Sequence, residues 1–392
     1  MKFRRIYDVV KPDSGSVWTL QERGRDGEDL RLLASAIRVF GPRNYTAIAR
    51  VTGLPVETVR YKIRKNLLER GIRVHVHINY GALGLARYWM FLEFSEDWES
   101  KAVELLDRLA KDDYMVYFGR IIPWGSFLAF VMLPPKFEAK YRIFLDKLVD
   151  MGVLRSYSMA RMSWIRYFSM RTDCYDFKNA TWQFDWDSLS KSDRPVAVSI
   201  EEDVQKPRID KLDLLIAGML QANSSLSIRE LARKLGVEYK RLLYHYKEHV
   251  LGRGIIKGYI VRWHGDRRWH KPLTRIAAVF HGLSADEAET VKKVFQDIPF
   301  TWFDAYSMVS EVYLAYLVVP AEHLQGMLKY TWKALPKLKR KMRYGFIDSE
   351  CSRSYMLPLK PFDETRGGWR FSIKANVNLL YEVLNVKKLK TQ

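Results

Sequence analysis

The sequence predicts an α+β protein: two winged helix-turn-helix domains, each followed by a ferredoxin-like α/β domain, in a tandem repeat that forms a pseudo-dimer. Three observations predict this fold class. One stretch of sequence recurs later in the chain, each copy has the spacing of three short helices, and each is followed by extended segments that alternate with helical ones. A chain of 392 residues has room for several such domains.

The repeat needs no gap where it is strongest. The segment that ends at Ile72 aligns with the segment that ends at Ile255. Identical residues are Ala49 and Ala232, Arg50 and Arg233, Gly53 and Gly236, Tyr61 and Tyr244, and residues 70–72 with 253–255. Further on, 128–134 matches 314–320, and Trp182 matches Trp369. The chain is therefore predicted to hold two full-length copies of one unit.

Domain boundaries follow from the repeat and from the polar, proline-containing stretch between its copies. The predicted parts are an N-terminal arm (1–25), winged helix-turn-helix 1 (26–80), ferredoxin-like domain 1 with its Trp-x-Phe segment (81–188), a linker (189–208), winged helix-turn-helix 2 (209–264), ferredoxin-like domain 2 (265–358), and a C-terminal Trp-x-Phe segment with a basic tail (359–392).

Composition indicates a folded protein with an anionic partner. Hydrophobic residues make up 48% and aromatic residues 14%, which is too apolar for a disordered chain. The net charge of +20 is typical of proteins that bind polyanions, although it does not identify the polyanion. We find no secretion signal and no 18-residue apolar run, so we expect no membrane partner and a cytoplasmic, nucleoid-associated location. Cys174 and Cys351 are too few for a disulfide scaffold.

Each copy has the pattern of a helix-turn-helix. In copy one, Asn44 is placed to cap the second helix and Gly53 to form the tight turn before the third. Ser227 and Gly236 are their counterparts in copy two. The third helices are expected to bury one apolar face, made of Val59, Ile63 and Leu67 in copy one and of Leu242, Tyr246 and Val250 in copy two.

The opposite face of each third helix is rich in basic and aromatic residues. It is predicted to consist of Thr58, Arg60, Tyr61, Lys62, Arg64 and Lys65 in copy one, and of Tyr239, Lys240, Arg241, Tyr244, His245 and Lys247 in copy two. Such a face can contact phosphates and base edges together, as a recognition helix in the major groove must. One basic face would indicate only a solvated surface, but its recurrence behind a glycine turn favours double-stranded DNA as the partner.

Extended segments follow both third helices and are predicted to be the wings. Arg73 and His75 lie on the first wing, and Lys257 and Arg262 on the second. We expect these four side chains to contact the DNA backbone or minor groove.

The segment GIIKGYIVRW after a glycine-turned third helix, with an α/β domain downstream, resembles the Lrp/AsnC family of feast-famine regulators. The resemblance implies that ferredoxin-like domain 1 holds a small-molecule effector, that the α/β domains dimerise, and that a homodimer is possible. The glycine that this family's effector pocket favours is present in copy one, as Gly119, whereas copy two has Ala305 there.

The α/β segments have the periodicity that this resemblance implies. Predicted strands are 86–94, 114–122, 126–133 and 154–162 in copy one, with helices at 101–111 and 140–150, and the strands of copy two are 274–282, 300–307, 311–319 and 340–348.

The sequence predicts neither a metal nor a cofactor. His245 and His249 are one helical turn apart, but the zinc-protease motif needs Glu directly after the first histidine. His75 and His77 share a strand face, where contact with phosphate or solvent is the favoured interpretation. The sequence has no Walker lysine loop, GxGxxG or GxSxG motif.

Three functions stay open, in this order. The favoured one is a transcription regulator, not an enzyme, that uses two unlike recognition helices to bind an asymmetric duplex site. The second is a non-specific architectural DNA-binding protein, suggested by the basic residues Lys337, Lys339, Arg340, Lys341 and Arg343. The third is an enzyme similar to tetrapyrrole decarboxylases with paired units of this kind, in which Tyr117, Arg120 and His281 serve a pocket.

Overall fold

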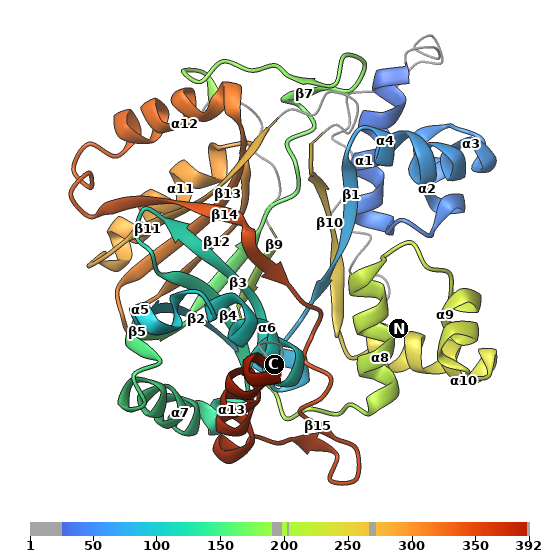
Figure 1. Ribbon diagram of the computed structural model, residues 1–392. Coiled ribbons are helices and arrows are strands. Elements are labelled where there is room, and N and C mark those ends of the chain that lie inside the picture. The colour runs from blue at the N-terminus through green and yellow to red at the C-terminus, as the bar shows by residue number, and fades with distance from the viewer. Residues whose placement is uncertain (1–25, 190–197, 202–203, 266–271, 390–392) are drawn as a thin grey trace.

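The computed structural model describes residues 26–189, 198–201, 204–265 and 272–389. The predicted N-terminal arm, parts of the predicted linker and the last residues of the basic tail lie outside these ranges. No helix among the described residues is long and apolar enough to cross a membrane. The predicted α+β class is confirmed, because helices cover a large antiparallel sheet (Figure 1).

Ten strands form the main sheet. Their order is β5 (Leu154–Arg161), β2 (Ala86–Phe94), β4 (Phe127–Leu133), β3 (Met115–Ile122), β14 (Met342–Ser354), β11 (Leu273–Phe280), β13 (Val312–Pro320), β12 (Thr301–Ser307), β6 (Trp164–Tyr167) and β9 (Val198–Glu201). The predicted strand segments all form strands of this sheet. Their ends differ from the prediction by a few residues, and the difference is largest at the C-terminal end of β14.

Each copy contributes four of these strands. When the four strands of a copy are numbered along the chain, their order in the sheet is fourth, first, third and second strand in both copies. Helices α6 (Ala102–Asp112) and α7 (Glu138–Asp150) connect the strands of copy one, and α11 (Ala285–Asp297) and α12 (Ala321–Ala334) those of copy two. Apolar side chains of α6, such as Leu105 and Leu109, are buried in the core. The sheet and its covering helices therefore repeat in the order that the sequence predicted.

The two four-stranded sets are joined by strands that cross between them. The long strand β14 pairs first with β11 and then, after an irregularity, with β3 of the other set. A second crossing joins β5 to β6. Strand β5 pairs with β2 at one end of the strand order. Strand β6 begins two residues after β5 and pairs with β12 near the opposite end of that order. Because so short a connection spans only about 10 Å, the sheet must curve back on itself. Its inner surface is shared by both copies.

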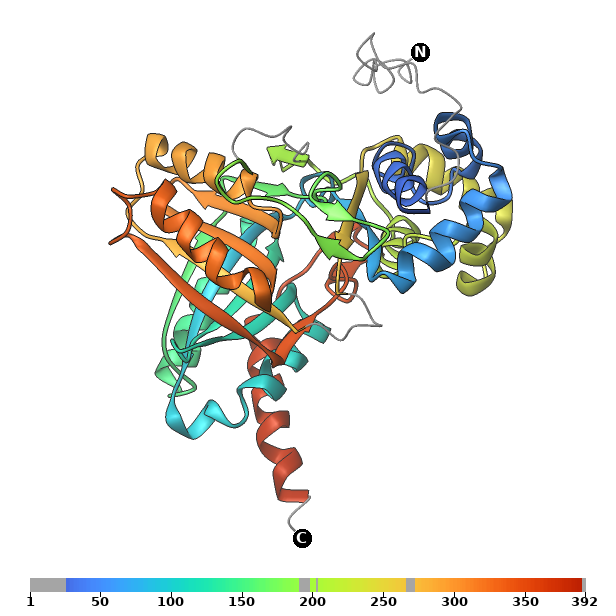
Figure 2. The same ribbon diagram turned by 90° about the horizontal axis from the view of Figure 1, so that it is seen from above.

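The helices that were predicted to form the two helix-turn-helix units lie together on one side of this sheet (Figures 1 and 2). The first group is α1 (Asp26–Phe40), α2 (Tyr45–Thr52), α3 (Val56–Tyr61), a π-helical segment (Lys62–Asn66) and α4 (Leu67–Glu69). The second is α8 (Lys211–Ala222), α9 (Ile228–Leu235), α10 (Tyr239–Tyr244) and a π-helical segment (His245–Leu251). Gly53 and Gly236 end α2 and α9 with φ of 70° and 63°, a left-handed conformation that glycine adopts without strain.

Two residues that were predicted to face outward are buried. Lys62 and His245, the first residues of the two π-helical segments, are each only 8% exposed. Each lies three residues after an inward-facing residue, Val59 or Leu242, and residues three apart share one face of a helix, so the predicted outward orientation is wrong. Val59, Ile63, Leu67, Leu242 and Val250 are buried as expected.

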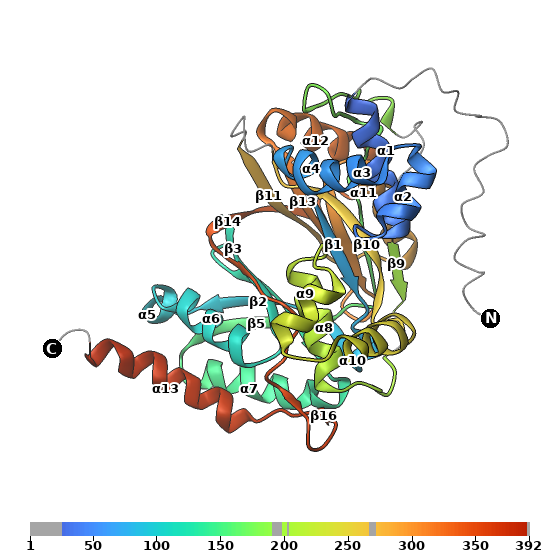
Figure 3. The same cartoon turned by 90° about the vertical axis from the view of Figure 1, so that its right-hand side faces the viewer.

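The predicted wings pair with each other. Strands β1 (Ile72–Ile78) and β10 (Ile256–Trp263) form an antiparallel two-stranded ribbon, with Arg73 opposite Arg262 and His75 opposite Ile260. Figure 3 shows this ribbon running beside both helical groups. The side chain of Arg43, just before α2, donates to the hydroxyls of Tyr246 (2.5 Å) and Tyr259 (2.9 Å), which ties the groups together. The ribbon is thus an internal connection between the copies.

Short elements complete the fold. They are α5 (Glu96–Glu99), the two-stranded pairs β7 (Tyr175–Asp176) with β8 (Thr181–Trp182) and β15 (Phe362–Asp363) with β16 (Gly368–Trp369), and the C-terminal helix α13 (Ile373–Leu389), which packs on α6 and α7. Both predicted Trp-x-Phe segments contribute to packing. Trp369, for example, donates from its indole nitrogen to the carbonyl of Leu83 (2.7 Å).

Candidate active site between the ribbon and the sheet

Two histidines meet at the ribbon. The Nε2 atoms of His75, on β1, and His264, just after β10, are 2.8 Å apart. One ring must donate and the other accept, so the contact requires at least one neutral imidazole. Burial, and then the positive charge of Arg262, lowers the pKa of His75 to about 2 and that of His264 to about 3. At neutral pH the two rings are therefore uncharged and share one hydrogen bond.

A third histidine lies deeper. His77 is 2% exposed, and neither of its ring nitrogens has a hydrogen-bond partner among the described residues. Its ring packs edge-on against Tyr167 of β6, with 5.0 Å between the centroids. Burial, followed by the charges of Arg87 and Lys257, holds its pKa well below the usual range. A buried polar group without a partner is costly, which is typical of a functional position.

Two arginines converge on the same tyrosine. The guanidinium of Arg87, on β2, lies over the rings of Tyr80 (5.0 Å) and Tyr167 (5.3 Å) and donates to the carbonyl of Ile78 (3.1 Å). The guanidinium of Arg262 lies over Tyr167 from β10, at 5.9 Å. Stacking on aromatic faces lets guanidinium groups stay charged within an apolar wall.

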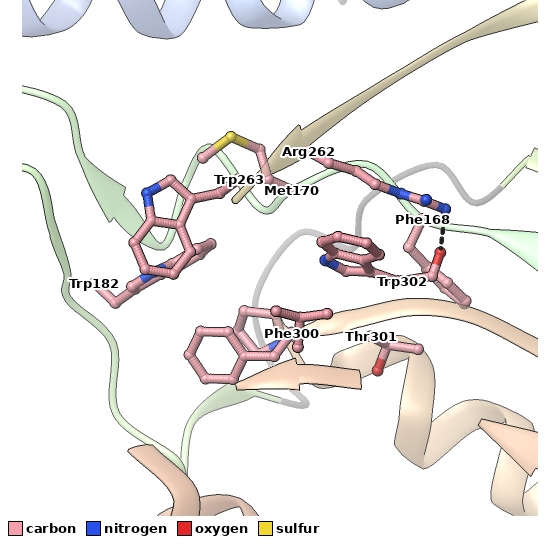
Figure 4. A pocket seen from close by; sticks show the side chains of 10 residues that line it. Phe168, Met170, Trp182, Arg262, Trp263, Phe300, Thr301 and Trp302 are labelled. Carbon is pink, nitrogen blue, oxygen red and sulfur yellow. Dashed lines mark hydrogen bonds between the residues drawn. The ribbon is translucent and has the colours of Figure 1, made fainter. Parts of the chain in front are cut away.

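Arg262 also contacts β12 of the sheet. Its guanidinium lies 4.8 Å from the ring centroid of Trp302 and donates to the carbonyl of that residue (3.0 Å), as Figure 4 shows. Burial lowers its pKa to about 10, so it remains cationic at neutral pH. Its Nε atom has no hydrogen-bond partner within the described part of the chain. Arg262 is therefore a cation with donor capacity left for a ligand.

Two cavities adjoin this cluster. The smaller, of about 10 Å³, is lined by Phe168, Met170, Trp182, Arg262, Trp263, Pro299, Phe300, Thr301, Trp302 and Val318 (Figure 4). The larger, of about 160 Å³, is lined by Tyr80, Val116, Phe130, Met132, Met162, Ile165, Tyr167, Gln221, Phe303 and Tyr355. No acidic side chain lines either one. The larger cavity is below the usual size of small-molecule sites, about 300–1,000 Å³, so a large ligand would enter it only if its walls moved apart.

The walls of the larger cavity come from both copies. Phe303 of copy two stacks on Tyr316, with 5.2 Å between the centroids and 9° between the ring planes, and meets Phe130 of copy one edge-on. The hydroxyls of Tyr117 and Tyr316 are 3.3 Å apart across the join. The arrangement therefore offers flat aromatic surfaces, fixed cations and neutral imidazoles. Such groups can bind a planar anion and transfer protons.

The DNA-contact residues predicted from the sequence divide into three sets. Exposed are Arg60, Tyr61, Arg64, Lys65, Arg73, Tyr239, Lys240, Arg241, Tyr244, Lys247 and Lys257, and partly buried are Thr58, His75 and Arg262. Lys62 and His245 are buried. His75 and Arg262 belong to the cluster described above, where they contact His264 and Trp302. The DNA contacts of the predicted residues stay a prediction.

The three residues suggested for an enzymatic pocket do not lie together. Tyr117 is at the join between the copies, but Arg120 forms an ion pair with Glu99 (3.0 Å) and His281 is exposed on copy two. The sequence analysis missed His264, Arg87, Tyr167 and Trp302, and gave His77 no catalytic role. Its one available signal was the alternation of His75 and His77 on a strand face.

Comparisons with known proteins identify the fold. No protein-family model and no curated protein sequence matches the chain. Among solved structures, the siroheme decarboxylase NirDL matches with a TM-score of 0.54 and 11% identity over 92% of this chain and 99% of its own. NirDL with an iron-uroporphyrin III analogue gives 0.54 and 10% over 91% and 99%. The transcriptional regulator NMB0573 from Neisseria meningitidis, complexed with L-Met, matches 38% of this chain and 97% of its own with a TM-score of 0.32 and 18% identity.

The full-length match corrects the predicted function. The chain was expected to be a DNA-binding regulator or architectural protein without enzymatic activity, and the fold that it shares from end to end is that of an enzyme. The resemblance to the Lrp/AsnC family is supported at the level of the fold.

Proposed function

We propose that the chain is a decarboxylase that acts on a tetrapyrrole carrying carboxylate side chains. The observation that carries the proposal is the cluster of Arg87, Arg262 and three histidines around Tyr167 and Trp302, beside two aromatic cavities, in the fold of a siroheme decarboxylase. The proposed decarboxylase is a tandem pair of helix-turn-helix and ferredoxin-like units that form a pseudo-dimer, with the helical units serving as a scaffold.

The cavity chemistry suits such a substrate. A tetrapyrrole macrocycle is flat and aromatic, so it can stack on Tyr167, Phe303 or Phe130, which line the larger cavity, once the walls of that cavity move apart to admit it. Its carboxylates carry negative charge, which the guanidinium of Arg262 can bind through the Nε atom that has no protein partner. His77 faces the same tyrosine and is the side chain available to approach a substrate metal.

The reaction needs one proton for each carboxylate lost. The bond between the carboxylate carbon and the adjacent carbon breaks, CO₂ leaves, and the electron pair stays on the substrate carbon until a proton is added. The hydrogen-bonded pair His75 and His264 can deliver that proton. In the free protein the pair is neutral, because burial and Arg262 lower both pKa values. A bound polyanion opposes Arg262 and raises them, so substrate binding would bring a proton to the pair.

The site is expected to occur once in each chain. Along the repeat, His75 and His77 correspond to Gly258 and Ile260, and Arg262 corresponds to Asn79. Copy one therefore supplies His75, His77 and Arg87, and copy two supplies His264 and Arg262. This arrangement supports one asymmetric site shared by the two copies and not two equivalent ones.

The proposal is tested with siroheme and iron-uroporphyrin III as probes. We expect each to bind the purified full-length protein with about one molecule per chain, measured by its visible absorption spectrum, and siroheme to lose CO₂, measured by mass spectrometry of the product. The matched control is the same macrocycle with esterified carboxylates, which should bind weakly and stay intact. A folded protein that neither binds nor changes siroheme would overturn the proposal.

A further inference from the structure

Four metal-ligating side chains converge in the second helical group, outside the candidate active site. They are Asp210, Asp213, His245 and His249, and one ligand atom of each lies within 4.8 Å of all the others. The Nδ1 atoms of His245 and His249 are 2.9 and 3.0 Å from the same oxygen, Oδ1 of Asp213. The Nδ1 atom of His245 is also 3.5 Å from Oδ2 of Asp210. The Asp213 side chain has no exposed surface, and those of His245 and His249 are 11% and 14% exposed.

Local structure holds these groups in place. Asp210 caps α8 and forms a capping box with Asp213, because the backbone N–H of each donates to the carboxylate of the other (3.1 and 2.9 Å). The box uses Oδ2 of Asp213 and Oδ1 of Asp210, which leaves the other oxygen of each carboxylate for the imidazoles. The two histidines come from the π-helical segment, whose first residue is His245. Such segments are rare and often mark functional sites.

We propose that Asp210, Asp213, His245 and His249 form a structural site for a first-row transition-metal dication, with Zn²⁺ as the best fit. Four protein ligands of nitrogen and oxygen are typical of closed structural zinc sites. In a tetrahedral zinc site with bonds of about 2.0–2.1 Å, ligand atoms lie about 3.4 Å apart. Three observed separations, of 2.9, 3.0 and 3.5 Å, are close to this value. All four ligand atoms lie within 4.8 Å of one another, so the widest pair would close by up to about 1.4 Å to reach it. Two carboxylates also balance the charge of a dication.

The other copy shows how the fold fills this position without a metal. On the repeat alignment, His245 corresponds to Lys62, Asp213 to Leu30, His249 to Asn66 and Asp210 to Gly27. Lys62 is buried and its ammonium lies 3.3 Å from a carboxylate oxygen of Asp29. Copy one thus has a lysine cation where copy two has two imidazoles facing two carboxylates. A dication in copy two would supply the positive charge that the ammonium supplies in copy one.

Neighbouring groups are consistent with a site that opens at the surface. Arg253 lies 3.8 Å from Oδ2 of Asp213, an oxygen that is also 3.2 Å from Nδ1 of His249. The ring of Tyr244 packs edge-on against both imidazoles, and the side chain of Asp210 is 48% exposed. The metal would join the start of α8 to the third helix. At the far end of α8, Gln221 donates to the hydroxyl of Tyr80 (3.2 Å), which lines the larger cavity.

This metal site could not be predicted from the residue pattern. The histidine spacing lacks the zinc-protease glutamate, and the two aspartates lie more than thirty residues before His245. Only the packing of α8 on the π-helical segment brings the four residues together. The inference is independent of the proposed decarboxylase activity, because its test measures metal content and unfolding.

The test uses full-length protein stripped with a chelator and then titrated with ZnCl₂. After dialysis we expect about one zinc per chain by elemental analysis, and a rise in Tm of a few degrees with added Zn²⁺. Co²⁺ in place of Zn²⁺ should give the visible absorption of a tetrahedral site. His281→Gln, which removes an exposed histidine elsewhere, is the matched control and should keep both responses.

Two variants separate metal binding from folding. His245→Lys copies the lysine of copy one, so the protein should fold, with the ammonium paired to Asp213, and should lose both the retained zinc and the Tm response. His249→Gln should fold and retain less than a tenth of the zinc. Wild-type protein that retains no zinc, or variants that keep the full zinc response, would overturn the proposal. Should His245→Lys fail to fold, His249→Gln and the wild-type stoichiometry decide the matter.

Discussion

The Nε2 atom of His75 lies 2.8 Å from the Nε2 atom of His264, although 188 residues separate the two histidines in the chain. Their contact exists because β1 and β10 pair across the repeat. Burial and the nearby guanidinium of Arg262 hold the pKa of both imidazoles far below that of a free imidazole.

Replacing His264 with glutamine should impair turnover more than binding. Glutamine can still donate or accept a hydrogen bond but cannot deliver a proton at neutral pH. We expect the decarboxylation rate to fall by about 10²- to 10⁴-fold, the usual contribution of a general acid or base. Siroheme affinity, measured by absorption titration, should stay within a few-fold of wild type. His281→Gln is the control, and equal losses in both variants would contradict the assignment.

The histidine pair should make the free protein less stable as pH falls. In the unfolded chain these histidines take up protons near pH 6.5, whereas in the folded protein their pKa values are about 2 and 3. Their stabilising contribution is therefore complete above about pH 6.5 and is lost on acidification toward pH 3. Each contributes a slope of up to about 1.4 kcal/mol per pH unit in that window.

The double variant His75→Gln/His264→Gln isolates this effect. The double variant must be compared with wild type because Asp113 has the opposite effect on the pH dependence of stability. Burial raises the pKa of Asp113 to about 7, so the stability that this residue contributes is lost as pH rises. Denaturant unfolding between pH 4 and pH 7 should show a shallower pH dependence for the double variant than for wild type. If the free energy of unfolding changed equally with pH in the double variant and in wild type, the fold would not hold the two imidazoles neutral.

Arg262→Met should weaken binding of the carboxylated macrocycle. A hydrogen bond to a charged group is worth about 1.5–3 kcal/mol, so Kd should rise by about 10- to 100-fold. Its partner across the ribbon, Arg73, is exposed and offers a matched control with the same change in net charge. Arg73→Met should alter Kd by less than about 2-fold, as expected for an exposed charge. Isothermal titration with iron-uroporphyrin III measures both, and equal effects would contradict a specific contact with Arg262.

Gly119→Ala should destabilise the junction between the two copies. A Cβ atom at Gly119 would lie 2.7 Å from the hydroxyl oxygen of Tyr117 and 2.8 Å from Cγ2 of Ile347 on β14. Overpacking of this kind costs about 1–3 kcal/mol, which urea unfolding can measure. Gly258 is also a strand glycine, but a Cβ there meets nothing within 4 Å, so Gly258→Ala should cost less. If Gly119→Ala were as stable as Gly258→Ala, β3 and β14 could move apart at position 119 without loss of stability.

Gly119 lies where β3 of copy one contacts β14 of copy two. The family resemblance associates this position with an effector pocket. In the structure the glycine lets β3 approach β14, with Phe118 and Gly119 opposite Arg353 and Ser352. Ala305, its counterpart in copy two, lies on β12 and pairs with Ile165 of β6.

Much of the local structure could be predicted from the sequence. Gly53 and Gly236 end helices with positive φ, and strand β2 has the predicted limits, Ala86–Phe94. Apolar periodicity and turn residues determine such features over a few neighbouring positions, so one chain segment contains all the information needed. The buried faces of the third helices are wider than a four-residue spacing indicates, so they also include Lys62 and His245, which lie three residues after Val59 and Leu242.

The sequence by itself determined the repeat, the α+β class and the identities of the helices and strands. Only the tertiary structure decided what the wings do: β1 pairs with β10, and this pairing turns His75 and Arg262 toward Trp302 and His264. Backbone pairing between strands so far apart depends on how the whole chain packs, and the residue pattern of one strand does not specify its partner. The physical reason is that a basic, histidine-containing strand suits an exposed wing and a buried ribbon equally well until its neighbours are known.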